Sequence, residues 1–221
     1  MNVSTATGIP IKVVGLAPDL VDYREALDLQ ERTEAAVKAG ESLGDVFLLE
    51  HPAVYTAGRR ADPADYPVDG TPVVPINRGG KVTWHGPGQL IGYPVFELRE
   101  HLRLVPYVRS VEQALIDSLA EIGVEGFRVE GRSGVWVNTG LPTDEKIAQI
   151  GIHASRGVTT HGFSLNCSTD NSVFHTFVPC GITDAGVTSI SQVLGRTVTP
   201  ADMVPIVTPH LEKLIEEVAV S

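Results

Sequence analysis

The chain of 221 residues carries 43% apolar and 20% charged side chains, with 22 glycines and 15 prolines, which is typical of a globular protein. This composition excludes a disordered, collagen-like or coiled-coil chain. The 27 acidic side chains outnumber the 17 basic ones, and the resulting net charge of −10 disfavours binding to nucleic acid or to an anionic membrane.

The chain also lacks features of membrane insertion and of division into several domains. No apolar run approaches the roughly 18 residues that a membrane-spanning helix requires, and residues 1–18 lack a basic segment followed by an apolar one. We therefore expect a cytoplasmic protein. Since no flexible linker or charge block interrupts the sequence, we expect a single domain over residues 1–221.

The first half of the chain is predicted to be rich in strands. A strand is expected at residues 11–16, followed by a helix that Asp19 caps and Gly40 ends. Further strands are expected at the short apolar or alternating stretches between Gly and Pro turns, namely residues 46–49, 54–57, 73–77, 82–85 and 90–96.

The second half is predicted to begin with a helix near Pro106, whose apolar stripe from Val108 to Ile122 must face a sheet. Three more strands are expected at residues 134–138, 147–152 and 159–166. Helices are expected at residues 189–194 and 203–218. Runs of strands with a few long helices indicate an α/β fold of the α+β type, with a mixed β-sheet and packed helices, and disfavour a doubly wound nucleotide-binding fold.

The segment from Arg78 to Gln89, Arg-Gly-Gly-Lys-Val-Thr-Trp-His-Gly-Pro-Gly-Gln, is rich in glycines on both sides of a short strand. Such glycines let backbone N–H groups approach a ligand closely, and Arg78, Thr83 and His85 add side-chain donors. The alternative is a hairpin strand between two tight turns. The spacing matches neither a P-loop nor a dinucleotide-binding fingerprint.

Two other segments carry candidate polar residues. Lys146 precedes an apolar strand, where it is either solvated or desolvated enough to have a lowered pKa. His161 lies in Thr-Thr-His-Gly-Phe-Ser-Leu-Asn, for which the alternative is an ordinary half-buried strand with a hydrogen-bonded histidine. Arg59 and Arg60 form either a solvated loop or a patch for an acidic partner.

The two cysteines are too few for a disulfide framework and lack the spacing of metal ligands. Pro179 and Gly181 bracket Cys180 on a turn, where its thiol could act as a nucleophile, whereas Cys167 ends an apolar strand and is expected to be buried. Lys146 could pair with the Cys180 thiolate, but chain spacing alone does not show that they meet. The seven histidines lack paired spacing, so no metal is expected.

Six segments in register carry a family resemblance. They are Tyr55–Arg59, Arg78–Pro94, Gly134–Val137, Lys146–Ala148, Thr160–Gly162 and Pro179–Ile182. Together they resemble the lipoyl(octanoyl) transferase family, which implies a fold like that of biotin and lipoate protein ligases and no cofactor. The resemblance implies transfer of an octanoyl group from octanoyl-acyl carrier protein to a lysine of lipoyl domains, the first step of endogenous protein lipoylation. The implied acceptors are lipoyl domains of 2-oxoacid dehydrogenase complexes and the glycine cleavage H protein.

The resemblance also implies roles for individual residues. Cys180 would carry the acyl thioester, and Lys146 would lower the pKa of that thiol and relay protons. The acyl substrate would lie against three segments, which comprise Arg78, Gly79, Gly80, Lys81, Val82, Thr83, Trp84, His85, Gln149, Ile150, Gly151, Gly162, Phe163 and Ser164.

Three other functions compete with this interpretation. An ATP-dependent lipoate or biotin protein ligase would need no nucleophilic cysteine, so the Pro-Cys-Gly turn at Cys180 argues against it. A noncatalytic acyl-binding or lipoyl-domain-binding module would need neither Cys180 nor Lys146. A cysteine hydrolase would need a histidine partner for Cys180, and the sequence identifies none.

Overall fold

The computed structural model describes residues 2–3, 7–62, 66–67, 70–99, 103–175 and 185–220. In chain order its elements are β1 (Asn2–Val3), β2 (Ile11–Gly15), α1 (Tyr23–Lys38), β3 (Gly44–Leu49), β4 (Val54–Ala57), β5 (Val73–Pro75), β6 (Val82–His85), β7 (Gln89–Phe96), α2 (Leu104–Glu121), β8 (Gly126–Val129), β9 (Arg132–Val137), β10 (Glu145–Ser155), β11 (Val158–Asn166), the 3₁₀ helix η2 (Asn171–His175), β12 (Gly186–Val187), α3 (Ile190–Leu194) and α4 (Pro200–Val218).

The strands form a large mixed sheet and a small one. The large sheet has the order β1-β2-β3-β7-β11-β10-β9-β8, and β12 pairs with β10. The pairs β2–β3 and β10–β12 are parallel, whereas the other neighbours in this sheet are antiparallel. The small sheet has the order β5-β4-β6. The expected mixed sheet with packed helices is therefore confirmed.

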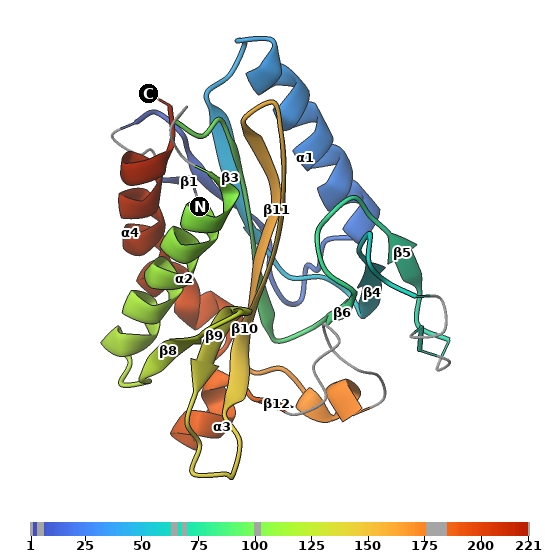
Figure 1. Ribbon diagram of the computed structural model, residues 1–221, viewed down its shortest axis with the longest axis vertical. Helices are drawn as coiled ribbons and strands as arrows, with labels where there is room; N and C mark the ends of the chain where they lie inside the picture. The colour runs from blue at the N-terminus through green and yellow to red at the C-terminus, as the bar shows by residue number, and fades with distance from the viewer. Residues whose placement is uncertain are drawn as a thin grey trace.

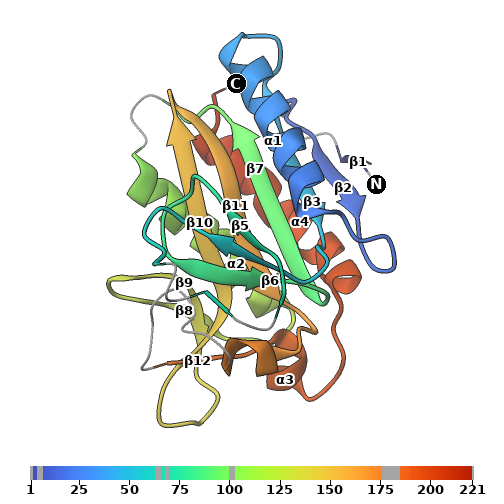
Figure 2. The same ribbon diagram turned by 90° about the vertical axis from the view of Figure 1, so that its right-hand side faces the viewer.

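Helices cover both faces of the large sheet. Figures 1 and 2 show α2 and α4 on one face, with α1 and the small sheet on the other. Alternation along β3 divides the core accordingly: Val46 and Leu48 join the cluster beneath α2 and α4, whereas Phe47 and Leu49 join the cluster beneath α1. A third apolar cluster lies beneath the small sheet and includes Trp84.

Helix starts differ from the sequence predictions. α1 begins at Tyr23 because the carboxylate of Asp22, not that of Asp19, accepts from the Arg24 amide at 2.8 Å. α4 begins at Pro200 with a Thr199–Asp202 capping box. Its internal Pro205 and Pro209 are exposed, so water can satisfy the carbonyl groups that lack an intrahelical partner there.

Strand β8 was not predicted from the sequence, because its four residues show no clear alternation of apolar and polar side chains.

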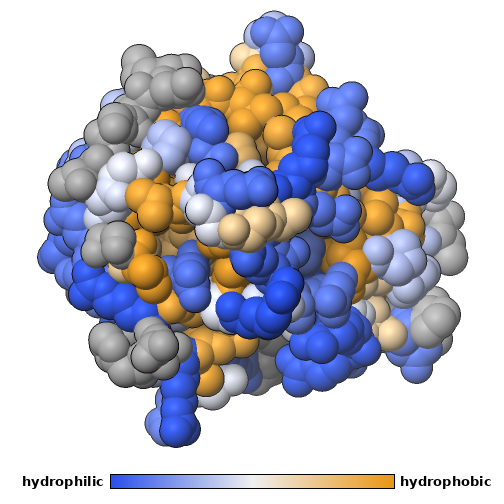
Figure 3. Space-filling model, turned by 90° about the horizontal axis from the view of Figure 1, so that it is seen from above, coloured by the Kyte–Doolittle hydropathy of each residue, from blue (hydrophilic) through white to orange (hydrophobic). Residues whose placement is uncertain are grey.

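Seen from above, the surface interleaves hydrophilic side chains with apolar ones (Figure 3). In the described part of the chain, no helix combines the length and apolar character needed to cross a bilayer.

Candidate active site

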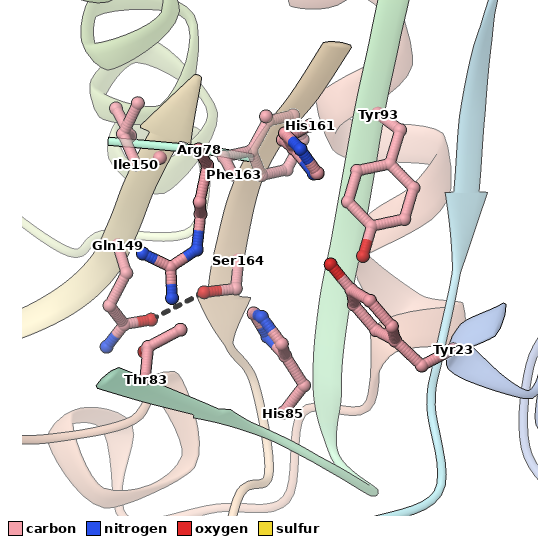
Figure 4. A pocket seen from close by; sticks show the side chains of 12 residues that line it. Tyr23, Arg78, Thr83, His85, Tyr93, Gln149, Ile150, His161, Phe163 and Ser164 are labelled. Carbon is pink, nitrogen blue, oxygen red and sulfur yellow. Dashed lines mark hydrogen bonds between the residues drawn. The ribbon is translucent and has the colours of Figure 1, made fainter. Parts of the chain in front are cut away.

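A pocket lies between the large sheet, the small sheet and the start of α1. Its volume is about 410 Å³ including the part open to solvent. Strands β7, β10 and β11 form one wall, and β6 with the loop before it forms the other (Figure 4). It is lined by Tyr23, Arg78, Thr83, His85, Tyr93, Gln149, Ile150, Gly151, His161, Gly162, Phe163 and Ser164.

The guanidinium of Arg78 extends into the middle of this pocket (Figure 4). The side chain is buried, and its Nη2 donates to both the carbonyl and the hydroxyl oxygen of Thr56 at 2.8 Å. Its Nη1 donates to the carbonyl of Gly79 at 2.8 Å. Arg78 therefore joins the glycine-rich loop to strand β4 and places a fixed positive charge at the pocket wall.

A chain of amide side chains fixes the tautomer of His85. His85 Nδ1 lies 2.8 Å from Gln89 Oε1, and Gln89 Nε2 donates to Asn166 Oδ1 at 2.8 Å. Since the Gln89 oxygen can only accept, the proton of His85 is on Nδ1 and its Nε2 carries a lone pair. Asn166 Nδ2 then donates to the carbonyl of Thr188. Thr188 in turn donates its amide to the carbonyl of Lys146 at 3.0 Å.

A second chain of hydrogen bonds orients the hydroxyl group of Tyr93. His51 Nδ1 lies 2.7 Å from the carbonyl of Val21, so this nitrogen carries the proton. Its Nε2 therefore accepts from the Tyr93 hydroxyl at 2.9 Å. The hydroxyl groups of Tyr23 and Tyr93 face one another in Figure 4.

Burial keeps the histidines of the site neutral. Burial lowers the pKa of His85 from 6.5 to about 3, and the nearby His51 and Arg78 act in the same direction. Burial likewise lowers the pKa of His51 and of His161 to about 4, with Arg78 adding to the effect at His161. Burial also raises the pKa of Tyr23 and Tyr93 above the usual value of 10.

Three buried polar atoms at the pocket have no hydrogen-bond partner among the described residues: Thr83 Oγ1, Gln149 Nε2 and His161 Nδ1. The Gln149 oxygen already accepts from Ser164 at 2.7 Å, which leaves its NH₂ group as the unsatisfied donor. Figure 4 shows Thr83 and Gln149 on the same side of the Arg78 guanidinium. Buried donors without partners are costly, so this wall suits a ligand with a carbonyl or carboxyl oxygen.

Lys146 lies on β10 and is buried, although it is not among the residues that line the pocket. Its Nζ donates to the carbonyl of Ser133 at 2.9 Å and lies 4.6 Å from the centre of the Trp136 ring. The sequence left a solvated and a buried lysine open as alternatives, and the structure shows the buried one. Gly186, at the start of β12, pairs with Glu145 directly beside it.

The predicted substrate residues fall into three groups. Nearly all polar ones line the pocket, together with Ile150, Gly151, Gly162 and Phe163. Val82 and Trp84 instead face the apolar cluster beneath the small sheet, since alternate side chains of β6 point to opposite faces. Gly79, Gly80 and Lys81 form the adjoining loop, in which backbone carbonyls accept from Arg78, Arg60 and Gly58.

Of the two cysteines, the structure describes Cys167 but not Cys180. Cys167 is fully buried in the main core, as expected, and burial raises the pKa of its thiol. Cys180, with the Pro179 and Gly181 that flank it, lies outside the described residues.

Sequence reasoning missed Tyr23, Tyr93 and His51 as site residues, and it did not place His161 in the pocket. Tyr23 reads only as a core position of a helix, and Tyr93 as part of a buried strand. His161 carried a local signal in the sequence, since it stands in Thr-His-Gly. In the structure its φ of 58° lies in the left-handed region that non-glycine residues seldom adopt.

The neutral histidines predict a specific dependence of stability on pH. As pH falls from about 6.5 toward 5, we expect the free energy of unfolding to fall by at least about 1 kcal/mol per pH unit. The reason is that the unfolded chain binds protons at His51, His85 and His161 in this range, whereas the folded chain does so only near pH 3 to 4.

Urea denaturation across this pH range measures the slope. His51→Gln should reduce it, whereas His210→Asn, remote from the pocket and paired with Glu121, should not. A slope that is flat, or that His51→Gln leaves unchanged, would contradict the neutral network.

Comparison with known proteins agrees with this geometry. The lipoyl protein ligase A/B catalytic domain family matches residues 22–212. The octanoyltransferase of Clavibacter sepedonicus is 54% identical over 211 residues, which cover 94% of this chain and 91% of that protein.

Solved structures share the fold at much lower identity. A bipartite lipoate protein ligase from Thermoplasma acidophilum, described together with its E2 lipoyl domain, has a TM-score of 0.69 at 13% identity and covers 93% of this chain and 84% of its own. The biotin protein ligase of Aquifex aeolicus with biotin and ATP has a TM-score of 0.57 at 14% identity, covering 93% and 71%. The expected ligase-like fold is therefore confirmed. The chain belongs to the lipoyl protein ligase A/B catalytic domain family and, within it, to the octanoyltransferases.

Proposed function

We propose that this chain, as a single catalytic domain, transfers an octanoyl group from octanoyl-acyl carrier protein to a lysine of lipoyl domains through a thioester on Cys180. The observation that carries the proposal is the pocket, where the unpartnered Gln149 amide and Thr83 hydroxyl suit the oxygen of an acyl group. Octanoyl as the group transferred rests on the relatives at about half identity. The ATP-dependent ligases share only the fold.

The position of Cys180 in the chain supports its pairing with Lys146. Only a few residues separate it from Gly186, which pairs with β10 beside Lys146. Residues 176–184 form the segment that contains Cys180. Phe174, before this segment, packs against Trp84 in the apolar cluster beneath the small sheet, and Val187, after it, packs against the same cluster. Both ends of the segment are thereby anchored on the side of the molecule that carries Lys146.

The reaction comprises two acyl transfers. In the first, the Cys180 thiolate attacks the thioester carbonyl of the donor, the carbon–sulfur bond to the carrier breaks, and the carrier leaves as a thiolate that takes a proton from the Lys146 ammonium. In the second, the amine of the acceptor lysine attacks the Cys180 thioester, an amide forms, and the cysteine leaves as a thiolate. As an ammonium, Lys146 stabilises the thiolate, and as an amine it takes the proton of the attacking lysine.

The thioester on Cys180 is directly testable. After mixing with octanoyl-acyl carrier protein without nucleotide, we expect the intact mass to rise by one octanoyl group that maps to Cys180. Cys180→Ser should abolish turnover because a hydroxyl is not ionised at neutral pH, whereas the control Cys167→Ala should still form the adduct. A strict requirement for ATP, or an adduct on Cys167, would contradict the assignment.

Lys146→Arg separates the two roles of Lys146. A guanidinium stays charged, so it can stabilise the thiolate but cannot accept a proton. We expect the variant to accumulate octanoyl-enzyme in a burst by intact mass with little octanoylated lipoyl domain, and Lys146→Ala to slow both steps. Near-native turnover of Lys146→Arg would assign the proton transfer to another group.

A basic rim of Arg59, Arg60 and Lys81 supports docking of acidic protein substrates. Arg59 and Arg60 are exposed, and their amides donate to the carbonyls of Arg78 and Gly80 in the loop that reaches the pocket. This local positive charge opposes the net charge of −10. The proposal includes octanoyl-acyl carrier protein as donor, lipoyl domains as acceptors and the cytoplasm as the location.

Charge reversal tests the rim. Arg59→Glu with Arg60→Glu should raise the apparent KM for both protein substrates severalfold and flatten its salt dependence. Arg196→Glu with Lys213→Glu, at exposed positions on the loop that follows α3 and on α4, is the control with the same change in net charge. An equal effect of both changes would show that only total charge matters.

A further inference from the structure

One peptide unit connects Lys146 to a buried carboxylate. The carbonyl of Ser133 accepts from Lys146 Nζ at 2.9 Å, and the amide of Gly134 donates to Glu112 Oε1 at 2.9 Å. Both groups belong to the same trans peptide, so they point in opposite directions. We propose that Glu112 is a positioning residue, which holds this peptide so that its carbonyl faces the ammonium group of Lys146. The inference rests on the proposed role of Lys146.

The peptide between Ser133 and Gly134 can bond to side chains because it lies beyond the part of β9 that pairs with β10. The register shifts between Lys146 and Ala148, and the pairing of β9 with β10 ends at Val135. Gly134 has a φ of 114°, and a Cβ there would lie 2.4 Å from the Ala148 carbonyl oxygen and 3.3 Å from Lys146 Cε. Glycine is therefore required both by the backbone conformation and by the lysine stem that passes beside it.

Glu112 is itself fixed in place. It is fully buried on α2, and its Oε2 accepts from Arg109 Nη1 at 2.6 Å and from Arg128 Nε at 3.0 Å. Both arginine side chains are about one third exposed. Their charge compensates the carboxylate on its outer side, which leaves Oε1 directed at Gly134.

The electrostatics of the arrangement favour an ammonium group at Lys146. A peptide dipole has its positive end at N–H and its negative end at C=O. The Glu112 carboxylate lies at the positive end and the Lys146 ammonium at the negative end, so both charges stabilise one orientation of the peptide. The Trp136 ring, 4.6 Å from Nζ, adds a second favourable contact for a cation.

Glu112→Gln tests the inference, because the amide keeps an oxygen for Gly134 but removes the charge. We expect kcat to fall about tenfold with KM nearly unchanged, as for the loss of one charge-assisted hydrogen bond. In a Lys146→Ala background the same substitution should change the residual rate less than about twofold, because the two residues act as a unit.

Two further variants separate positioning from stability. Arg109→Met removes one ion pair of Glu112 but leaves the Gly134 contact, so kcat should stay within about twofold of native while urea denaturation reports the lost stability. Glu112→Asp keeps the charge but withdraws the oxygen from Gly134, and its kcat should fall as in Glu112→Gln. This second variant keeps the test decisive where Glu112→Gln folds poorly.

NMR gives a readout that is independent of activity. Glu112→Gln should shift the amide proton of Gly134 and the ¹⁵N resonance of the Lys146 ammonium, whereas Arg109→Met should shift neither. Unshifted resonances in Glu112→Gln, rate losses that add to those of Lys146→Ala, or equal losses in Glu112→Gln and Arg109→Met would each overturn the inference alone. Near-native kcat of Lys146→Ala would instead overturn the proposed role of Lys146, and the positioning role of Glu112 with it.

Discussion

The buried guanidinium of Arg78 is the interaction on which the architecture of the pocket depends. It extends from the glycine-rich loop, and donates to strand β4 through both oxygen atoms of Thr56 and to its own loop through Gly79. These bonds fix the loop to the small sheet, and the Arg78 side chain passes beside Gly151 of the large sheet, where an added Cβ would lie 2.9 Å from Arg78 Cδ. The same charge helps to keep His85 and His161 neutral, so it also sets the electrostatic character of the site.

Fixed hydrogen-bond directions connect the pocket to the strand that carries Lys146. The bonds from His85 to Gln89, Asn166 and the Thr188 carbonyl each have one possible direction, and Thr188 then pairs with the Lys146 backbone. Such a fully satisfied buried network is rigid. The histidine lone pair and the lysine are thereby held in one frame, although they lie on different strands.

The sequence predicted much of the large sheet and the pocket for identifiable reasons. Buried strands such as β3 and β7 contain apolar runs near glycine and proline turns, and the site loop combines glycines with Arg78 and His85. The tyrosines and His51 were missed because three separate elements bring them together only on folding. For Val82 and Trp84 a run of adjacent residues was assigned to the substrate, whereas β6 alternates its faces and places these two side chains in the apolar cluster rather than along the pocket.

The same fold in lipoate and biotin ligases shows that the scaffold does not decide the chemistry. What distinguishes this chain is the proposed combination of Cys180 with a buried, oriented lysine. A buried lysine on a strand would be costly without partners, and Ser133 and Trp136 supply them. The position of the ammonium is therefore built into the fold before any substrate binds.

The most direct test of the account is a crystal structure of the Lys146→Arg protein after reaction with octanoyl-acyl carrier protein. The account predicts density for an octanoyl thioester on Cys180, with its acyl group in the pocket beside Gln149 and Ser164. An octanoyl group attached to another residue, or an acyl chain outside that pocket, would contradict it.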